Sequence, residues 1–218
     1  MDRDRITFAL PKGRLLEKAV ELLLKAEIDA SQVLEKTRKL IFENGKYRFI
    51  LVKPFDVSTY VYHGAADLGI AGKDVIEEKG LDVYEPIDLK FGFCRLCVAE
   101  PVDISEPYDI EKLSFIKVAT KFPKITDKYF RSKGVHPEII ELYGSVEIAP
   151  LLELTDRIVD LVQTGSTMKA NGLREVDTIL VSTARLIVNR ASLKTKYERV
   201  KDLVGRIKEI YLSGNISK

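Results

Sequence analysis

Strand-like and helix-like segments alternate along nearly the whole chain, and this alternation restricts the possible folds more than any other feature. Short apolar runs such as 5–10 and 116–120 are typical of buried strands. Longer segments, from 13–27 near the start to 191–212 near the end, carry apolar residues at helical spacing. The pattern predicts an α/β fold with mainly parallel sheets.

The remaining elements follow from turn signals and periodicity. Asn44-Gly45 inside 40–52 predicts a hairpin. Further helices are predicted over 55–63, 74–79 and 123–133, and further strands over 67–71, 92–99, 138–142, 157–162 and 178–188. Two prolines and a run of polar residues make 100–107 the best candidate for a domain boundary.

Composition excludes several classes of function. Lys and Arg total 35 against 33 for Asp and Glu, so net charge gives no reason to expect nucleic acid or a membrane as a partner. No apolar run approaches the ~20 residues of a membrane span. No secretory signal precedes the first strand, so we expect a cytoplasmic protein. We interpret Cys94 and Cys97 as core residues, since His63 and His136 lack the spacing of metal ligands.

The strongest local motif follows the apolar segment that begins at Arg157. This segment ends near Asp160, and Thr164-Gly165-Ser166-Thr167 then opens a short helix. Glycine allows close backbone approach, and consecutive N–H groups with three hydroxyls suit a phosphate monoester on a ribose. Asp160 is placed to accept hydrogen bonds from the ribose hydroxyls. The same four residues also suit a plain turn with a helix N-cap.

A longer pattern distinguishes these two interpretations. The segments 147–152, 155–160, 164–167 and 171–173 together resemble the phosphoribosyl pyrophosphate signature of the ATP phosphoribosyltransferase family. Further segments resemble the same family in the same order, namely 9–15, 38–40, 53–57, 63–74, 94–96 and 118–123. The resemblance runs from about residue 6 to about residue 190, which is far more specific than any single motif.

The resemblance implies a fold and a reaction. The fold is the two-lobed type II periplasmic-binding-protein-like α/β fold, with residues 1–93 and 184–218 in one lobe, 94–183 in the other, and the active site in the interlobe cleft. In the reaction, N1 of ATP displaces pyrophosphate, carried by Mg²⁺, from C1′ of phosphoribosyl pyrophosphate at the first step of histidine biosynthesis. The short form of the family implies a homodimer that associates with a regulatory subunit similar to histidyl-tRNA synthetase.

The resemblance also assigns roles to individual residues. The turn Thr164, Gly165, Ser166 and Thr167 would hold the 5′-phosphate, and Asp160 the ribose. The candidate catalytic cations are Lys12, Arg38 and Lys53, and the further substrate-binding candidates are Gly13, Arg14, Gly72, Arg95, Glu141 and Glu147. The alternative for each cation is a solvated surface charge, and for each glutamate a strand end or a helix start. Lys53 stands where many relatives carry arginine, and lysine lacks the bidentate fork.

Two other functions stay open at the level of the sequence. One is a periplasmic-binding-protein-like solute-binding module without catalysis, which shares the architecture. The other is a phosphoribosyltransferase that uses a different nitrogenous base.

Overall fold

The computed structural model describes residues 5–212, and the chain divides into two compact units. The first unit contains the residues up to Gly92 and again those from Thr183, and the second contains Phe93–Ser182. The chain therefore passes between the units twice. The boundary expected at 100–107 is wrong, because that segment lies inside the second unit, where Glu100 is fully buried.

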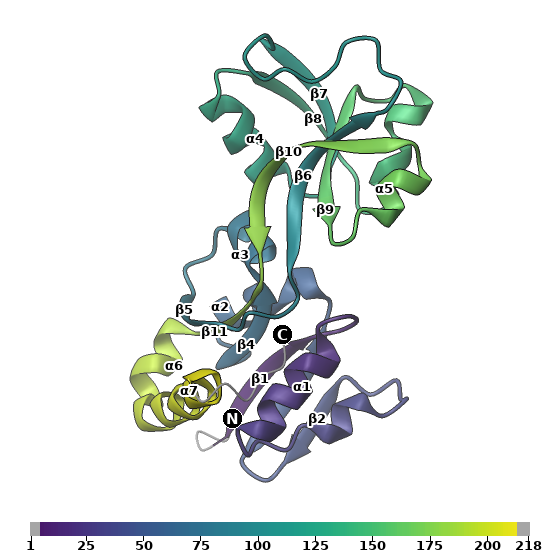
Figure 1. The fold of residues 1–218 in the computed structure, drawn as a ribbon. Helices are drawn as coiled ribbons and strands as arrows, with labels where there is room; N and C mark the ends of the chain where they lie inside the picture. Colours follow the sequence, from purple (N-terminus) through teal and green to yellow (C-terminus); the bar gives the residue numbers. More distant parts are fainter. Residues whose placement is uncertain (1–4, 213–218) are drawn as a thin grey trace. The chain divides into compact units, whose positions relative to one another are not determined.

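The first unit is built on a six-stranded sheet with the order β2-β3-β1-β4-β11-β5 (Figure 1). Its strands are β1 (Ile6–Pro11), β2 (Ile41–Asn44), β3 (Tyr47–Val52), β4 (Leu68–Gly72), β5 (Tyr84–Asp88) and β11 (Ala184–Val188). β1 runs parallel to β3 and β4, and the other pairs are antiparallel.

Helices cover both faces of this sheet. They are α1 (Leu16–Lys25), η1 (Ser31–Leu34), η2 (Pro54–Asp56), α2 (Val57–Tyr62), α3 (Lys73–Lys79), α6 (Arg190–Thr195) and α7 (Tyr197–Leu212). The two-residue period of β1 separates two hydrophobic clusters: Phe8 packs in the cluster of α1 and α7, and Ala9 in the cluster of α2 and α3. None of the helices within residues 5–212 combines the length and apolarity that crossing a membrane requires.

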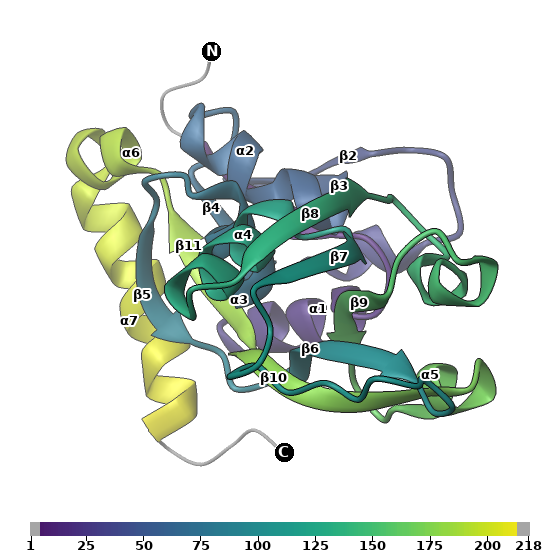
Figure 2. The same ribbon diagram turned by 90° about the horizontal axis from the view of Figure 1, so that it is seen from above.

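The second unit contains a five-stranded sheet with the order β10-β6-β9-β7-β8. Its strands are β6 (Cys94–Pro101), β7 (Phe115–Thr120), β8 (His136–Glu141), β9 (Arg157–Val162) and β10 (Leu173–Ser182). Figure 2 shows β10 beside β6 and β7 beside β8 at the two ends of this sheet. The helical segments are α4 (Pro123–Ser132), η3 (Val146–Ile148), η4 (Pro150–Leu152) and α5 (Ser166–Ala170).

Three expectations about local structure need correction. Both sheets are mixed rather than mainly parallel, since β6 and β11 each run antiparallel to both neighbours. The predicted strand 178–188 is two strands, because β10 and β11 belong to different sheets and Thr183 stands between them. The predicted helix 191–212 is likewise two helices, interrupted at Lys196, and β5 was not predicted.

A buried carboxylate attaches the C-terminal helices to the first sheet. Asp67 accepts hydrogen bonds from the Thr7 backbone N–H at 2.8 Å, from Ser192 Oγ at 2.6 Å and from Lys196 Nζ at 2.9 Å. Lys196 Nζ also donates to the Arg5 carbonyl oxygen at 2.7 Å. The lysine at the break between α6 and α7 is therefore fixed against the residue that precedes β1.

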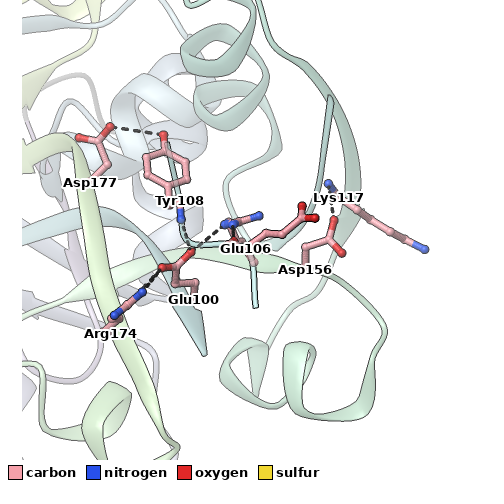
Figure 3. A network of polar contacts seen from close by, with 8 residues as sticks. Glu100, Glu106, Tyr108, Lys117, Asp156, Arg174 and Asp177 are labelled. Atoms are coloured by element: carbon pink, nitrogen blue, oxygen red, sulfur yellow. Dashed lines mark hydrogen bonds and ion pairs between the residues drawn. The ribbon is translucent and has the colours of Figure 1, made fainter. Parts of the chain in front are cut away.

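A second buried carboxylate ties together three strands of the second unit (Figure 3). Glu100 on β6 receives Arg157 Nε from β9 at 3.0 Å and Arg174 NH2 from β10 at 2.8 Å. It also accepts the backbone N–H of Tyr108 at 2.9 Å, and Arg157 NH2 donates to the Glu106 carbonyl at 2.6 Å. These two bonds hold the loop after β6, which contains Glu106 and Tyr108, against Glu100 and Arg157.

Replacing this carboxylate should destabilise the protein strongly. In Glu100→Ala, the buried Arg157 guanidinium loses its carboxylate partner and keeps only the Glu106 carbonyl, and removing one member of a buried ion pair costs about 3–5 kcal/mol. The free energy of unfolding in urea measures the effect. Asp127→Ala, which breaks an exposed ion pair with Arg131, is the control and should cost at most about 1 kcal/mol. Equal losses in both variants would contradict the role of Glu100.

Candidate functional site

The turn after β9 has a conformation suited to an anion. Gly165 is buried and has a φ of +77°, in the left-handed region that favours glycine. The Ser166 backbone N–H donates to Thr164 Oγ1 at 3.4 Å, and the two hydroxyl oxygens lie 3.0 Å apart. Thr167 is exposed in the first turn of α5. The turn therefore brings the hydroxyls of Thr164 and Ser166 together at the start of the helix, and Thr167 follows them.

Asp160 lies just upstream of this turn in an environment that disfavours its charge. Burial raises the pKa of Asp160 above its ordinary value, and the negative charge of Glu147 raises it further. The backbone N–H of Leu161, which donates at 2.8 Å, and the positive charge of Lys121 act in the opposite direction. Glu147 is therefore near enough for its charge to act on Asp160, whereas Glu141 is exposed at the end of β8.

Lys121 is a functional candidate that the sequence reasoning missed. It follows β7 directly, β7 pairs with β9 in parallel, and its charge acts on Asp160. The only sequence feature that pointed to Lys121 is its place in the 118–123 segment, which resembles the family. The ends of parallel strands meet at one sheet edge, so its position depends on the pairing of β7 with β9.

Arg95 is engaged within the second unit. Its NH2 group lies 2.8 Å from Glu175 Oε2, and the Cys97 Sγ donates to the same oxygen at 3.4 Å. Burial is the main reason that the pKa of Cys97 is raised to about 11. Cys97 therefore carries a protonated thiol at neutral pH, and a nucleophilic thiolate is disfavoured. Glu175 had no sequence signal, because its contact with Arg95 spans 80 residues.

The basic turn of the first unit borders a cavity of about 730 Å³. The Lys12 backbone N–H donates to the Val52 carbonyl at 2.9 Å, and Gly13, with a φ of +83°, leads into α1. The wall of the cavity combines cations with apolar side chains. Its lining residues are Lys12, Gly13, Arg14, Leu16, Glu17, Val33, Leu34, Glu35, Thr37, Lys39, Leu40 and Leu51.

The other predicted residues of the first unit lie outside this lining. Arg38 is exposed before β2, although its neighbour Lys39 lines the cavity, and Lys53 is exposed directly after β3. Gly72 is buried at the start of α3, and a Cβ there would collide with the Asp74 carboxylate. A side chain at position 72 would therefore require the Asp74 carboxylate to move.

The donor set near Asp160 does not form a complete metal cage. Within residues 5–212, no group of three or more His, Cys, Asp or Glu side chains gathers in a way that would hold a metal ion. Asp160 and Glu147 nevertheless supply two carboxylates. Mg²⁺ typically takes one or two carboxylates together with substrate phosphates and water, so these residues fit a magnesium ion that arrives with a phosphorylated substrate.

Comparison with known proteins identifies the family. The model of the family described as ATP phosphoribosyltransferase matches residues 53–209. The chain belongs to the ATP phosphoribosyltransferase family. An ATP phosphoribosyltransferase of Citrifermentans bemidjiense is 55% identical over 203 residues, which cover 92% of this chain and 96% of that relative.

One solved structure agrees with this family membership, and a second shares the fold. A chain of the ATP phosphoribosyl transferase (HisG:HisZ) complex from Thermotoga maritima is 37% identical, with a TM-score of 0.81 and coverage of 94% of this chain and 98% of that chain. The substrate binding protein of an amino acid ABC transporter aligns at 13% identity with a TM-score of 0.59, covering 96% of this chain and 94% of that one. The predicted family and the predicted periplasmic-binding-protein-like fold are confirmed. The solute-binding alternative is not favoured, because the relative that is 55% identical is named as an enzyme.

The environment of Asp160 predicts an unusual stability change. A carboxyl whose pKa is raised on folding binds its proton more tightly in the folded state, so its ionised form destabilises the fold above that pKa. Asp160→Asn should therefore be more stable than the parent protein at pH 7. The difference should shrink as pH falls toward the ordinary value of 3.8, as followed by urea unfolding at several pH values.

Asp109→Asn is the control, because the pKa of Asp109 is shifted in the opposite direction from that of Asp160. The hydrogen bond from Lys112 lowers the pKa of Asp109, so this carboxylate stabilises the fold at neutral pH and loses that effect as pH falls. Its replacement should be neutral to slightly destabilising at pH 7. A loss of stability in Asp160→Asn at pH 7 would contradict the assigned environment.

Proposed function

We propose that this chain transfers the phosphoribosyl group of phosphoribosyl pyrophosphate to N1 of ATP, releasing pyrophosphate at the first step of histidine biosynthesis. The observation that carries the proposal is the glycine-hydroxyl turn after β9, just downstream of the partly buried Asp160, in a chain of the ATP phosphoribosyltransferase family.

The second unit is proposed to bind the sugar phosphate. Backbone N–H groups at Gly165 and the start of α5, with the hydroxyls of Thr164, Ser166 and Thr167, would bind the 5′-phosphate. Asp160 would accept hydrogen bonds from the ribose hydroxyls, and Glu147 lies close enough to act on its charge. A partly buried carboxylate gains more from such hydrogen bonds than a fully exposed one, since fewer water molecules compete for it.

The first unit is proposed to bind polyphosphate. Lys12, Arg14 and Lys39 line one cavity, and Arg38 and Lys53 are exposed on the segments adjacent to this lining. Cations fixed by a tight turn stabilise the negative charge that develops on departing pyrophosphate without reorganising. They suit the triphosphate of ATP for the same reason.

The chemistry needs alignment more than it needs a reactive side chain. The N1 lone pair of adenine forms a bond to C1′ while the bond from C1′ to the pyrophosphate oxygen breaks, and its electron pair leaves with pyrophosphate. Holding both substrates in line contributes roughly 7–11 kcal/mol. Mg²⁺ bound with the pyrophosphate would neutralise part of its charge, with Asp160 and Glu147 as the available carboxylates.

A partner subunit is part of the proposal. The Thermotoga maritima structure contains a HisG:HisZ complex. By analogy, we expect a homodimer of this chain to associate with a regulatory subunit similar to histidyl-tRNA synthetase, in the cytoplasm.

A spectrophotometric assay for phosphoribosyl-ATP tests the proposal. Purified protein with ATP, phosphoribosyl pyrophosphate and Mg²⁺ should form this product and release pyrophosphate, with and without a co-purified regulatory subunit. Product with another base but not with ATP would favour a different phosphoribosyltransferase. Ligand binding with no pyrophosphate release under any condition would favour a non-catalytic module.

The turn predicts the effect of removing one hydroxyl. Thr167→Val keeps the shape of the side chain and removes a donor to the phosphate, which should cost about 1–3 kcal/mol of binding. The KM for phosphoribosyl pyrophosphate should rise accordingly, while the KM for ATP stays close to that of the parent. Thr195→Val on α6 is the matched control, and an unchanged KM in Thr167→Val would remove this hydroxyl from the site.

A further inference from the structure

Glu175 on β10 makes contacts that connect the phosphate turn to the neighbouring strands. Its Oε1 would lie 3.1 Å from a Cβ built on Gly165, and its Oε2 receives Arg95 NH2 at 2.8 Å. The pairing of β10 with β6 shifts register between Glu175 and Asp177. Such an irregularity redirects side chains at the edge of a site. The carboxylate thus lies close enough to position 165 that a side chain there would displace it slightly.

The same face of the sheet carries the proposed ribose contact. Cys97 stands directly opposite Asp160 on β9 and opposite Thr178 on β10. Directly opposite residues in antiparallel strands project to the same face. Since the Cys97 thiol contacts Glu175 Oε2 at 3.4 Å, Asp160 and the Glu175 carboxylate lie on one face, on either side of Cys97.

The charge of Glu175 makes its partner important. A lone carboxylate close to Gly165 would repel a phosphate dianion bound at the turn. Arg95 neutralises it, and the pair is only partly exposed, at 38% for the arginine and 28% for the glutamate side chain. Arg95 Nε is buried and has no hydrogen-bond partner within residues 5–212. The contact with Glu175 is therefore what fixes the guanidinium beside the turn.

We propose that Glu175 is a positioning residue for phosphoribosyl pyrophosphate. Its carboxylate lies against the Gly165 turn and holds the Arg95 guanidinium next to that turn. This inference rests on the proposed function, because it assigns the turn to the 5′-phosphate. Glu175 itself does not contact the substrate. Its effect is transmitted through the backbone of the turn and through the guanidinium of Arg95.

Binding of each substrate to Glu175 variants tests the proposal. Glu175→Ala removes the contact that holds Arg95 beside the turn, and should weaken phosphoribosyl pyrophosphate binding about tenfold or more, because a misplaced substrate-binding group can cost that much. Loss of the negative charge alone would strengthen phosphate binding, so a weaker affinity reports the loss of positioning. Glu175→Gln keeps the shape against Gly165 and one acceptor for Arg95, and should recover most of the affinity. The KM for ATP should stay within about twofold of the parent in both variants, because the proposed cation cavity lies in the other unit.

Titration calorimetry with phosphoribosyl pyrophosphate, together with both KM values, distinguishes the outcomes. Glu85→Ala is the matched control, since Glu85 is 26% exposed and pairs with Lys73 at 3.0 Å in the first unit, and it should leave sugar-phosphate affinity unchanged. Unchanged affinity in Glu175→Ala, or equal weakening of both substrates, would overturn the positioning role while leaving the proposed function intact. A parent protein that binds no phosphoribosyl pyrophosphate would overturn both.

Discussion

The passage of the chain between its two sheets is the constraint on which the rest of the structure depends. Both crossing segments are fixed to the first sheet by backbone hydrogen bonds: Leu89 N–H to the Ala184 carbonyl, and Ala184 N–H to the Phe91 carbonyl, each at 2.9 Å. Thr183 adds a side-chain bond to Asp88 Oδ1 at 2.7 Å. Although burial raises the pKa of Asp88, hydrogen bonds from Lys90 and Thr183 lower it overall. An ionised carboxylate thus holds the outgoing and returning segments in one place.

This constraint explains the mixed sheets. A chain that leaves one sheet and returns beside its own point of departure must run antiparallel to a neighbour, as β11 does to β5 and β10 does to β6. The parallel pairs are those on either side of β1 and β7. The proposed site residues follow the carboxyl ends of β1 and β9, where open α/β sheets usually bind ligands.

The two candidate regions differ in the charged groups that they offer to a substrate, and this division suits the proposed reaction. In the second unit the charge of Glu147 raises the pKa of Asp160, and the carboxylate of Glu175 is paired with Arg95. In the first unit, lysines and an arginine line the 730 Å³ cavity beside leucine side chains. Carboxylates suit ribose hydroxyls and a positive anomeric centre, whereas fixed cations suit pyrophosphate.

The sequence by itself determined the features that local chemistry encodes. Asn44-Gly45 specified the hairpin of β2 and β3, Gly80 the end of α3, and the family signature identified the enzyme family. Tertiary structure alone decided the contacts between strands distant in sequence: the effect of Glu147 and Lys121 on Asp160, and the pairing of Glu175 with Arg95. The physical reason is that strand order and register are set by burial of whole sheet faces. This burial depends on residues far apart in the sequence, so a local sequence pattern does not predict it.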